Sequence, residues 1–349
     1  MFGNLPGWCI AAVLLVATGT LLFLRGRPQV YAPTSTGQLK VFMKKADLST
    51  DPVSLVPKGT DPGDGGAQYL AFASGYDKAK FKTWNDLYAR AADPDQSKPQ
   101  AAKDAAKKAA DKLATSGNFD GMFGPLIAGS KSSSASIFTA NPTHLINYRG
   151  EENKMVLPEL VAGGMAALQY ASALKPTNPQ RARDLQVAVF QLGRALYQER
   201  VSWKEYEAGL KLMGEAAFRM ALLPPAQAVG DAAALKSFTE ECNGRLSEYR
   251  EQVQVAFYSV LSGNEMWKLT GDVIEVATKS PEPMWQVQAL MRLGVIKTLS
   301  QVSALDQEHI SNLLTQTAAR TDLPANVKAA ATNADKITTA ERQGSVEQY

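Results

Sequence analysis

Cysteine is scarce in this chain of 349 residues, which contains only Cys9 and Cys242. Cys9 lies in an apolar stretch near the N-terminus and Cys242 in a polar, helix-forming stretch, so a disulfide would have to join two very different environments. The cysteines therefore do not indicate a redox compartment. Because Cys242 falls on the apolar stripe of its helix, we expect a buried structural thiol rather than a nucleophile.

Histidine is equally scarce, and His144 and His309 are its two occurrences. Neither has a Cys, His, Asp or Glu partner at a metal-ligand spacing, and the sequence contains no H-E-x-x-H, C-x-x-C or G-x-S-x-G motif. We interpret Asp306, three residues before His309, as a helix N-cap. We therefore predict no catalytic, cofactor-binding or metal-binding residue, no cofactor, and a protein without enzymatic activity.

The chain also lacks a large excess of one charge. Lys and Arg number 37 against 34 Asp and Glu, which leaves a formal net charge of +3. This balance argues against a nucleic-acid partner. Any basic surface must be local, as in the lysine-rich residues 98–114, which we interpret as a solvated helix. Attraction of this helix to anionic lipid is an alternative.

One long hydrophobic run is present, since no charged side chain occurs in residues 5–24. About 20 residues at about 1.5 Å each match a hydrocarbon core of about 30 Å. Trp8 before the run, and Arg25 and Arg27 after it, are of the types that favour the membrane interface. We predict a single transmembrane anchor over residues 1–27, with membrane lipid as the partner of residues 5–24.

A cleaved signal peptide is the alternative, but residues 1–7 supply no positive charge besides the α-amino group. Basic residues follow the run, namely Arg25, Arg27, Lys40, Lys44 and Lys45. By the positive-inside rule, they place the folded part in the cytoplasm. An extracytoplasmic, periplasmic location is nearly as well supported, because a single N-terminal anchor often carries an exported domain.

Composition divides the rest of the chain into five parts. Residues 28–66 are rich in Pro, Gly, Ser and Thr, which predicts a flexible linker. The other parts are N-terminal helices over 67–115, a low-order loop over 116–153, a helical domain over 154–340 and a disordered tail over 341–349. Within the N-terminal helices, aromatic residues at near-helical spacing over 67–92 predict a helix that packs them into a core.

Two apolar stripes at helical spacing, in residues 178–202 and 203–225, predict an antiparallel helical hairpin. A long helix is expected over residues 231–261. The stretch GPLIAGSKS at residues 124–132 approximates a phosphate-binding loop, but Ser130 separates the second glycine from Lys131. That motif needs Lys directly after the glycine, so we expect no nucleotide site there.

An offset of 40 residues relates the segments that begin at Met284 and Pro324, and it pairs Val287 with Val327. The pattern V-x-A-L-x-x-L-G in the first segment resembles the first helix of a HEAT repeat, whose period is close to 40. This resemblance implies an α-solenoid of the HEAT or tetratricopeptide kind, and a compact helical bundle is the competing arrangement. The fold class expected on either view is all-α.

These features favour a membrane-anchored helical scaffold or adaptor, which holds a protein partner near the membrane through exposed helix faces. The alternative is an envelope enzyme, or a factor that handles a lipid or glycan, with a pocket between helices of the C-terminal domain. A pocket with a perturbed carboxylate or His309 would favour that alternative. Self-association into a homo-oligomer through residues 231–261 is a further alternative.

Overall fold

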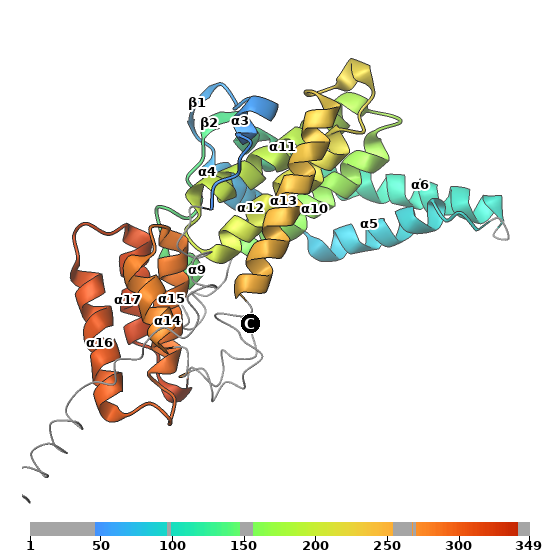
Figure 1. The fold of residues 1–349 in the computed structure, drawn as a ribbon. Coiled ribbons are helices and arrows are strands. Elements are labelled where there is room, and N and C mark those ends of the chain that lie inside the picture. The colour runs from blue at the N-terminus through green and yellow to red at the C-terminus, as the bar shows by residue number, and fades with distance from the viewer. Residues whose placement is uncertain (1–45, 96–98, 147–155, 254–266, 268–269, 341–349) are drawn as a thin grey trace, which may run out of the picture. The chain divides into compact units, whose positions relative to one another are not determined.

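The computed structural model describes residues 46–95, 99–146, 156–253, 267 and 270–340. These residues divide into two compact units, one that ends at Glu251 and one formed by the residues after it. Helices make up nearly all of the regular structure in the described ranges, which confirms the all-α expectation (Figure 1).

Short elements precede the long helices of the first unit. This unit contains α3 (Pro52–Leu55), β1 (Asp61–Asp64), α4 (Gly66–Gly75), α5 (Lys78–Ala91), α6 (Gln100–Ser116), α7 (Phe119–Met122), α8 (Gly124–Ser130), β2 (Ser132–Ser134), α9 (Thr143–Ile146), α10 (Val156–Leu174), α11 (Pro179–Glu199), α12 (Trp203–Met220), the 3-10 helix η2 (Pro225–Gln227) and α13 (Ala232–Val253). The second unit contains α14 (Thr270–Lys279), α15 (Pro283–Ile296), α16 (Ala304–Ala319) and α17 (Ala325–Asp335). The two strands form a small parallel pair.

Helices α11 and α12 form the expected antiparallel hairpin at the centre of the first unit. The Asn178 side chain accepts from the N–H of Arg181 and so caps the start of α11. Arg200, in the left-handed conformation (φ 42°), ends that helix. The two backbones approach closely where Gly193 faces Gly209, and a Cβ at Gly209 would lie only 2.7 Å from Gly193 O. Glycine is therefore required at this crossing.

The aromatic residues of 67–92 enter a core as expected, although they lie on two helices instead of one. Asp77 starts α5 as its N-cap, because its side chain accepts from the N–H of Lys80. The Trp84 ring lies 5.6 Å from that of Tyr170 and 5.8 Å from that of Phe119 between centroids. Such pairs add to the free energy that burial of the rings provides.

The expected low-order loop over 116–153 is described from residue 116 to residue 146, and there it differs from the expectation. This stretch contains α7, α8, β2 and α9. Phe119, Phe123, Leu126 and Phe138 are fully buried within it. The Gly- and Ser-rich composition of this stretch suggested low order, although a few well-spaced apolar residues lie within it. Burial of these residues stabilises ordered structure.

The second unit begins with α14, and its helices α15 and α17 contain the two segments related by the 40-residue offset. They pack directly against each other, since a Cβ at Gly294 would lie 2.5 Å from Ala334 O. Val287 and Val327 are both buried. The N-cap of α16 is Ser303, which accepts from the N–H of Asp306, so our assignment of Asp306 as the cap was wrong by three residues.

The predicted anchor over 1–27 and tail over 341–349 lie wholly outside the described residues. The linker over 28–66, the loop over 116–153, the helical domain over 154–340 and the helix over 231–261 lie partly outside them, and α13 covers 232–253 of that last helix. Among the helices that the structure describes, none combines the length and apolar character needed to cross a bilayer.

Candidate functional site

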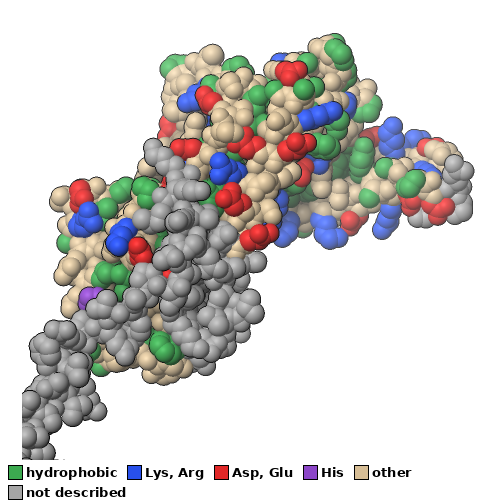
Figure 2. Space-filling model, viewed as in Figure 1, with side chains coloured by type: hydrophobic (Ala, Val, Ile, Leu, Met, Phe, Trp, Pro, Cys, Tyr) green, Lys and Arg blue, Asp and Glu red, His purple; other side chains and the backbone are tan. Residues whose placement is uncertain are grey.

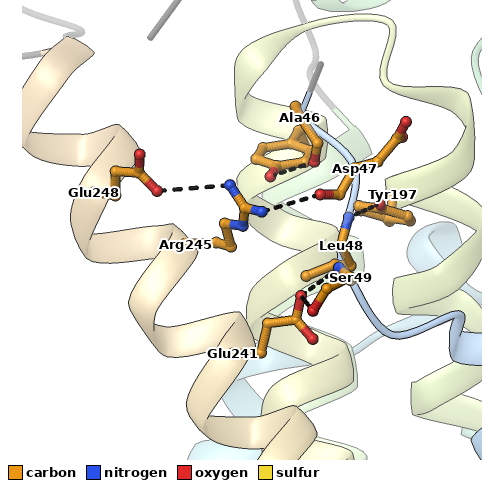
Figure 3. A network of polar contacts seen from close by, with 9 residues as sticks. Ala46, Asp47, Leu48, Ser49, Tyr197, Glu241, Arg245 and Glu248 are labelled. Carbon is orange, nitrogen blue, oxygen red and sulfur yellow. Dashed lines mark hydrogen bonds and ion pairs between the residues drawn. The ribbon is translucent and has the colours of Figure 1, made fainter. Parts of the chain in front are cut away.

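A segment that we call the strap, defined as residues 46–58, lies across the central helices of the first unit (Figure 3). Only the short helix α3 interrupts its irregular path. Ala46 and Val56 are buried, at 0 and 1% exposure. The strap falls within the stretch 28–66, which we expected to be a flexible linker, and from residue 46 on this stretch packs against the helical body.

Two tyrosines of the hairpin bond to the backbone of the strap. The hydroxyl of Tyr206 donates to Ala46 O at 2.8 Å, and Leu48 N donates to the hydroxyl of Tyr197 at 2.7 Å. Desolvation by burial raises the pKa of both tyrosines, so the hydroxyls stay protonated at neutral pH. These bonds fix the start of the strap on α11 and α12.

Helix α13 holds the strap through a carboxylate. The Glu241 carboxylate accepts from the N–H and hydroxyl of Ser49 and from the N–H of Thr50. Desolvation by burial raises the pKa of Glu241, but these hydrogen bonds outweigh it and bring the pKa below its usual value. Arg245, one turn further along α13, donates to Asp47 O at 3.3 Å (Figure 3).

The far end of the strap is held by α11. Arg194 donates to Val56 O at 2.9 Å, and Gln191 donates to Pro57 O at 2.7 Å. Arg200, just after α11, forms an ion pair with Asp47 near the start of the strap. The strap is therefore bonded along its length to three helices that are more than a hundred residues away in the sequence.

We expect Glu241→Ala to loosen the strap without unfolding the helices. Amide hydrogen exchange of Ser49 and Thr50 at pH 7 should become about tenfold faster, because a charge-assisted hydrogen bond contributes about 1.5 kcal/mol. Glu240→Ala is the matched control, since the Glu240 side chain is exposed on the same helix. Equal exchange in the two variants would contradict the assigned role of Glu241.

The same bonds predict a pH dependence. A carboxylate whose pKa is lowered by folding stabilises the folded form above its unfolded pKa, and this contribution is lost as pH falls through the folded pKa. In the wild type, exchange of the strap amides should therefore accelerate, relative to that of amides in the core of α11, when the pH falls below about 4.5. This extra acceleration should be absent from Glu241→Ala.

A second polar cluster joins α11 to the loop after β2. The Glu199 carboxylate accepts from the N–H groups of Ile137 and Phe138 and from the hydroxyl of Thr139. Its neighbour Glu205 is fully buried. Burial first, and then the hydrogen bond to Glu199 and its negative charge, raise the pKa of Glu205 well above its usual value. Burial beside Glu199 therefore favours the neutral form of Glu205.

The structure also locates the residues that the sequence singled out. His309 is exposed on α16, whereas the side chain of His144 lies outside the described part of the chain. Cys242 is fully buried, and desolvation raises its pKa to about 12, which agrees with the expected structural thiol. Within the described ranges, no group of three metal-ligating side chains occurs.

A basic hairpin of α5 and α6, which we call the arm, extends from the central helices of the first unit (Figures 1 and 2). The two helices carry eight basic side chains against three acidic ones. Lys107, Lys108 and Lys112 are exposed on α6. This local basic surface is the one that the sequence placed over residues 98–114.

Sequence reasoning missed the strap and the Glu199–Glu205 pair, and one signal for them was available. Tyr197 and Tyr206 lie on the buried face of the hairpin, and a buried hydroxyl needs a hydrogen-bond partner. The sequence could not identify that partner, because Tyr206 and Ala46 are 160 positions apart.

Comparison of the chain with protein-family models, curated proteins and solved structures gives no match. The fold and the strap therefore define only a general class of protein. The chain is an all-α protein in which an N-terminal strap is fixed across an antiparallel helical hairpin.

Proposed function

We propose that this protein is a membrane-anchored helical adaptor, in which the N-terminal run binds lipid and the helical body holds a protein partner. The observation that carries the proposal is the attachment of the strap. Because residues 46–58 are bonded to α11, α12 and α13, the packed body begins at residue 46, a short distance along the chain from the apolar run. An anchor over that run would hold the body near the bilayer.

Two exposed features support partner binding by the body. The arm offers a basic surface to an acidic partner, and electrostatic complementarity of this kind favours fast and specific association. Phe218 and Leu222, one turn apart, are 47 and 51% exposed. Large exposed apolar side chains next to polar surface are typical of interaction sites. The proposed partner is therefore a protein with an acidic surface that complements the arm.

The proposal places the body in the cytoplasm, as the basic residues after the run indicate. The proposal does not include the enzymatic activity that the sequence left as an alternative. That alternative needs a perturbed carboxylate that substrate can reach, and the perturbed Glu205 is fully buried against Glu199.

The test uses the full-length protein with a C-terminal tag, crosslinked in its native host and then solubilised in detergent. We expect membrane association that survives carbonate extraction, together with one stoichiometric protein partner. The double variant Leu14→Asp, Leu15→Asp should release the protein from the membrane, since charge at the centre of a span is costly. Soluble wild-type protein would contradict the anchor.

A matched pair of charge variants tests partner binding. Lys107→Glu with Lys108→Glu should lower recovery of the partner at least fivefold, because it reverses charge on the arm. Lys131→Glu with Lys236→Glu changes two exposed lysines elsewhere in the same unit and should leave recovery unchanged. Recovery of the protein alone would contradict the adaptor function, and the compartment of a recovered partner tests the orientation.

A further inference from the structure

A small polar pocket lies in the first unit where the end of the strap, α4, the start of β2 and α11 meet. It encloses about 280 Å³ of space, including the part open to solvent. The side chains that matter for its chemistry are Lys58, Tyr69, Ser132, Ser133, Gln191 and Arg194. They come from four stretches of the chain that only the fold brings together.

Arg194 places a positive charge in this pocket. The side chain is only 5% exposed, and its bond to Val56 O uses one of five N–H donors. No carboxylate of the described residues forms an ion pair with it. Desolvation by burial lowers the pKa of Arg194, yet a guanidinium stays charged in proteins. The exposed carboxylate of Asp51 acts on Arg194 electrostatically but forms no ion pair with it. A buried charge without an ion-pair partner is unfavourable, so the pocket is suited to an anion.

Two further polar groups at the pocket lack partners among the residues that the structure describes. Tyr69 is 1% exposed, and its hydroxyl has no hydrogen bond to any residue that the structure describes. Burial raises the pKa of Tyr69, so its hydroxyl remains a donor. The Gln191 amide is oriented by the bond from its Nε2 to Pro57 O, which leaves Oε1 as a buried acceptor without a partner.

We propose that this pocket binds a small tetrahedral oxyanion, either inorganic phosphate or the terminal phosphoryl group of a phosphomonoester. Arg194 and Lys58 supply positive charge, and the hydroxyls of Tyr69, Ser132 and Ser133 supply donors. Near neutral pH, inorganic phosphate keeps a P–OH group that can donate to Gln191 Oε1, whereas a phosphomonoester, whose second pKa is about 6, must bind as its monoanion to do so. Inorganic phosphate thus offers oxygens to the cations and the hydroxyl donors, and a proton to the acceptor.

This site differs from the nucleotide loop that the sequence of residues 124–132 suggested and that its spacing excluded. The stretch contributes Gly129 and Ser132 where α8 ends, whereas the cations come from Lys58 and Arg194. The proposal is independent of the adaptor function.

The test is thermal unfolding and titration calorimetry of the full-length protein in detergent at pH 7, with phosphate against chloride at equal ionic strength. We expect saturable phosphate binding and a rise of several degrees in unfolding temperature. Sulfate, which has no proton for Gln191 Oε1, should bind at least fivefold more weakly. Absence of saturable binding would overturn the proposal, and equal binding of sulfate would overturn phosphate as the ligand.

Variants locate the site without disturbing the fold. Tyr69→Phe removes only a hydroxyl that has no partner in the described part of the chain, and Lys58→Gln changes an exposed side chain. Each should weaken phosphate binding at least fivefold and leave unfolding in chloride unchanged. Lys131→Gln is the control, since Lys131 is exposed next to Ser132 but does not line the pocket. Equal binding by all three variants would overturn the location.

The two sources of the phosphoryl group are distinguished by a parallel titration with glycerol phosphate. Tighter binding of the ester than of inorganic phosphate would support the phosphomonoester form of the proposal. Tighter binding of inorganic phosphate would support the free ion. In either case Tyr69→Phe must weaken the binding, and an ester that binds equally to wild type and variant would overturn its assignment to this pocket.

Discussion

Gly209→Ala lowers the free energy of unfolding of the first unit by about 2–4 kcal/mol, because no space exists for a methyl group at this crossing. A Cβ at Gly209 would lie 2.6 Å from Tyr197 N and 2.7 Å from Gly193 O. Both atoms belong to the backbone of α11, so the strain cannot be relieved by rotation of a side chain. Alanine is the better helix former by about 1 kcal/mol, which only partly offsets the strain.

The measurement is urea unfolding of the full-length protein in detergent, followed by the hydrogen exchange of amides in α11 and α12. Gly244→Ala is the control, since Gly244 lies within α13 with no atom within 4 Å of an added Cβ. It should stabilise the protein by up to about 1 kcal/mol. If Gly209→Ala behaved like this control, the close approach of the two helices would be wrong.

Glu205→Gln should stabilise the protein at pH 7, by about 1.4 kcal/mol for each unit by which folding raises the pKa of Glu205, and leave it nearly unchanged at pH 4. Glutamine keeps both contacts of the neutral acid, because its Oε1 can accept from the N–H of Val201 and its Nε2 can donate to Glu199. Since glutamine cannot ionise, the variant avoids the free-energy cost of burying a carboxyl that is ionised in the unfolded chain, and this cost grows as the pH rises.

The direction of this change in stability with pH follows from the raised pKa of Glu205. The folded state holds this proton more tightly than the unfolded state, so the stabilising contribution is full below the unfolded pKa of about 4.3. It is lost as the pH rises through the folded pKa, at up to about 1.4 kcal/mol per pH unit. The difference between the variant and the wild type should therefore grow with pH.

Chemical unfolding at a series of pH values from 4 to 8 measures this difference. Glu215→Gln is the control, since Glu215 is a half-exposed carboxyl on the same helix. Its substitution should change the free energy of unfolding by less than about 0.5 kcal/mol. A Glu205→Gln effect that is equal at pH 4 and pH 8 would show that Glu205 is ionised in the fold and is not the neutral acid inferred from its burial.

Much of the helical architecture is contained in local patterns. The stripes over 178–202 and 203–225 correspond to α11 and α12, and Asn178 followed by proline marks the start of the first. The lysine-rich stretch 98–114 corresponds to α6, which begins after Pro99. These features depend on spacing along the chain and on residue propensity, so they can be recognised without tertiary contacts.

Composition was a poorer guide where the chain is rich in Gly, Ser and Pro. Residues 46–66 and 116–146 resemble linkers in composition, yet Val56, Phe123 and Phe138 are buried there. A few buried side chains, together with hydrogen bonds to the backbone, order such a segment. Their partners lie on helices elsewhere in the sequence, and composition carries no information about them.

The sequence by itself determined the fold class, the central helical hairpin, the buried Cys242 and the local basic surface. Only the tertiary structure decided the strap, the Glu199–Glu205 pair and the polar pocket around Arg194. Helices follow from interactions between residues three and four positions apart, whereas these sites join groups that are up to 198 positions apart. A spacing rule cannot specify which distant carboxylate or carbonyl a side chain meets, because that choice is made by the packing of the whole unit.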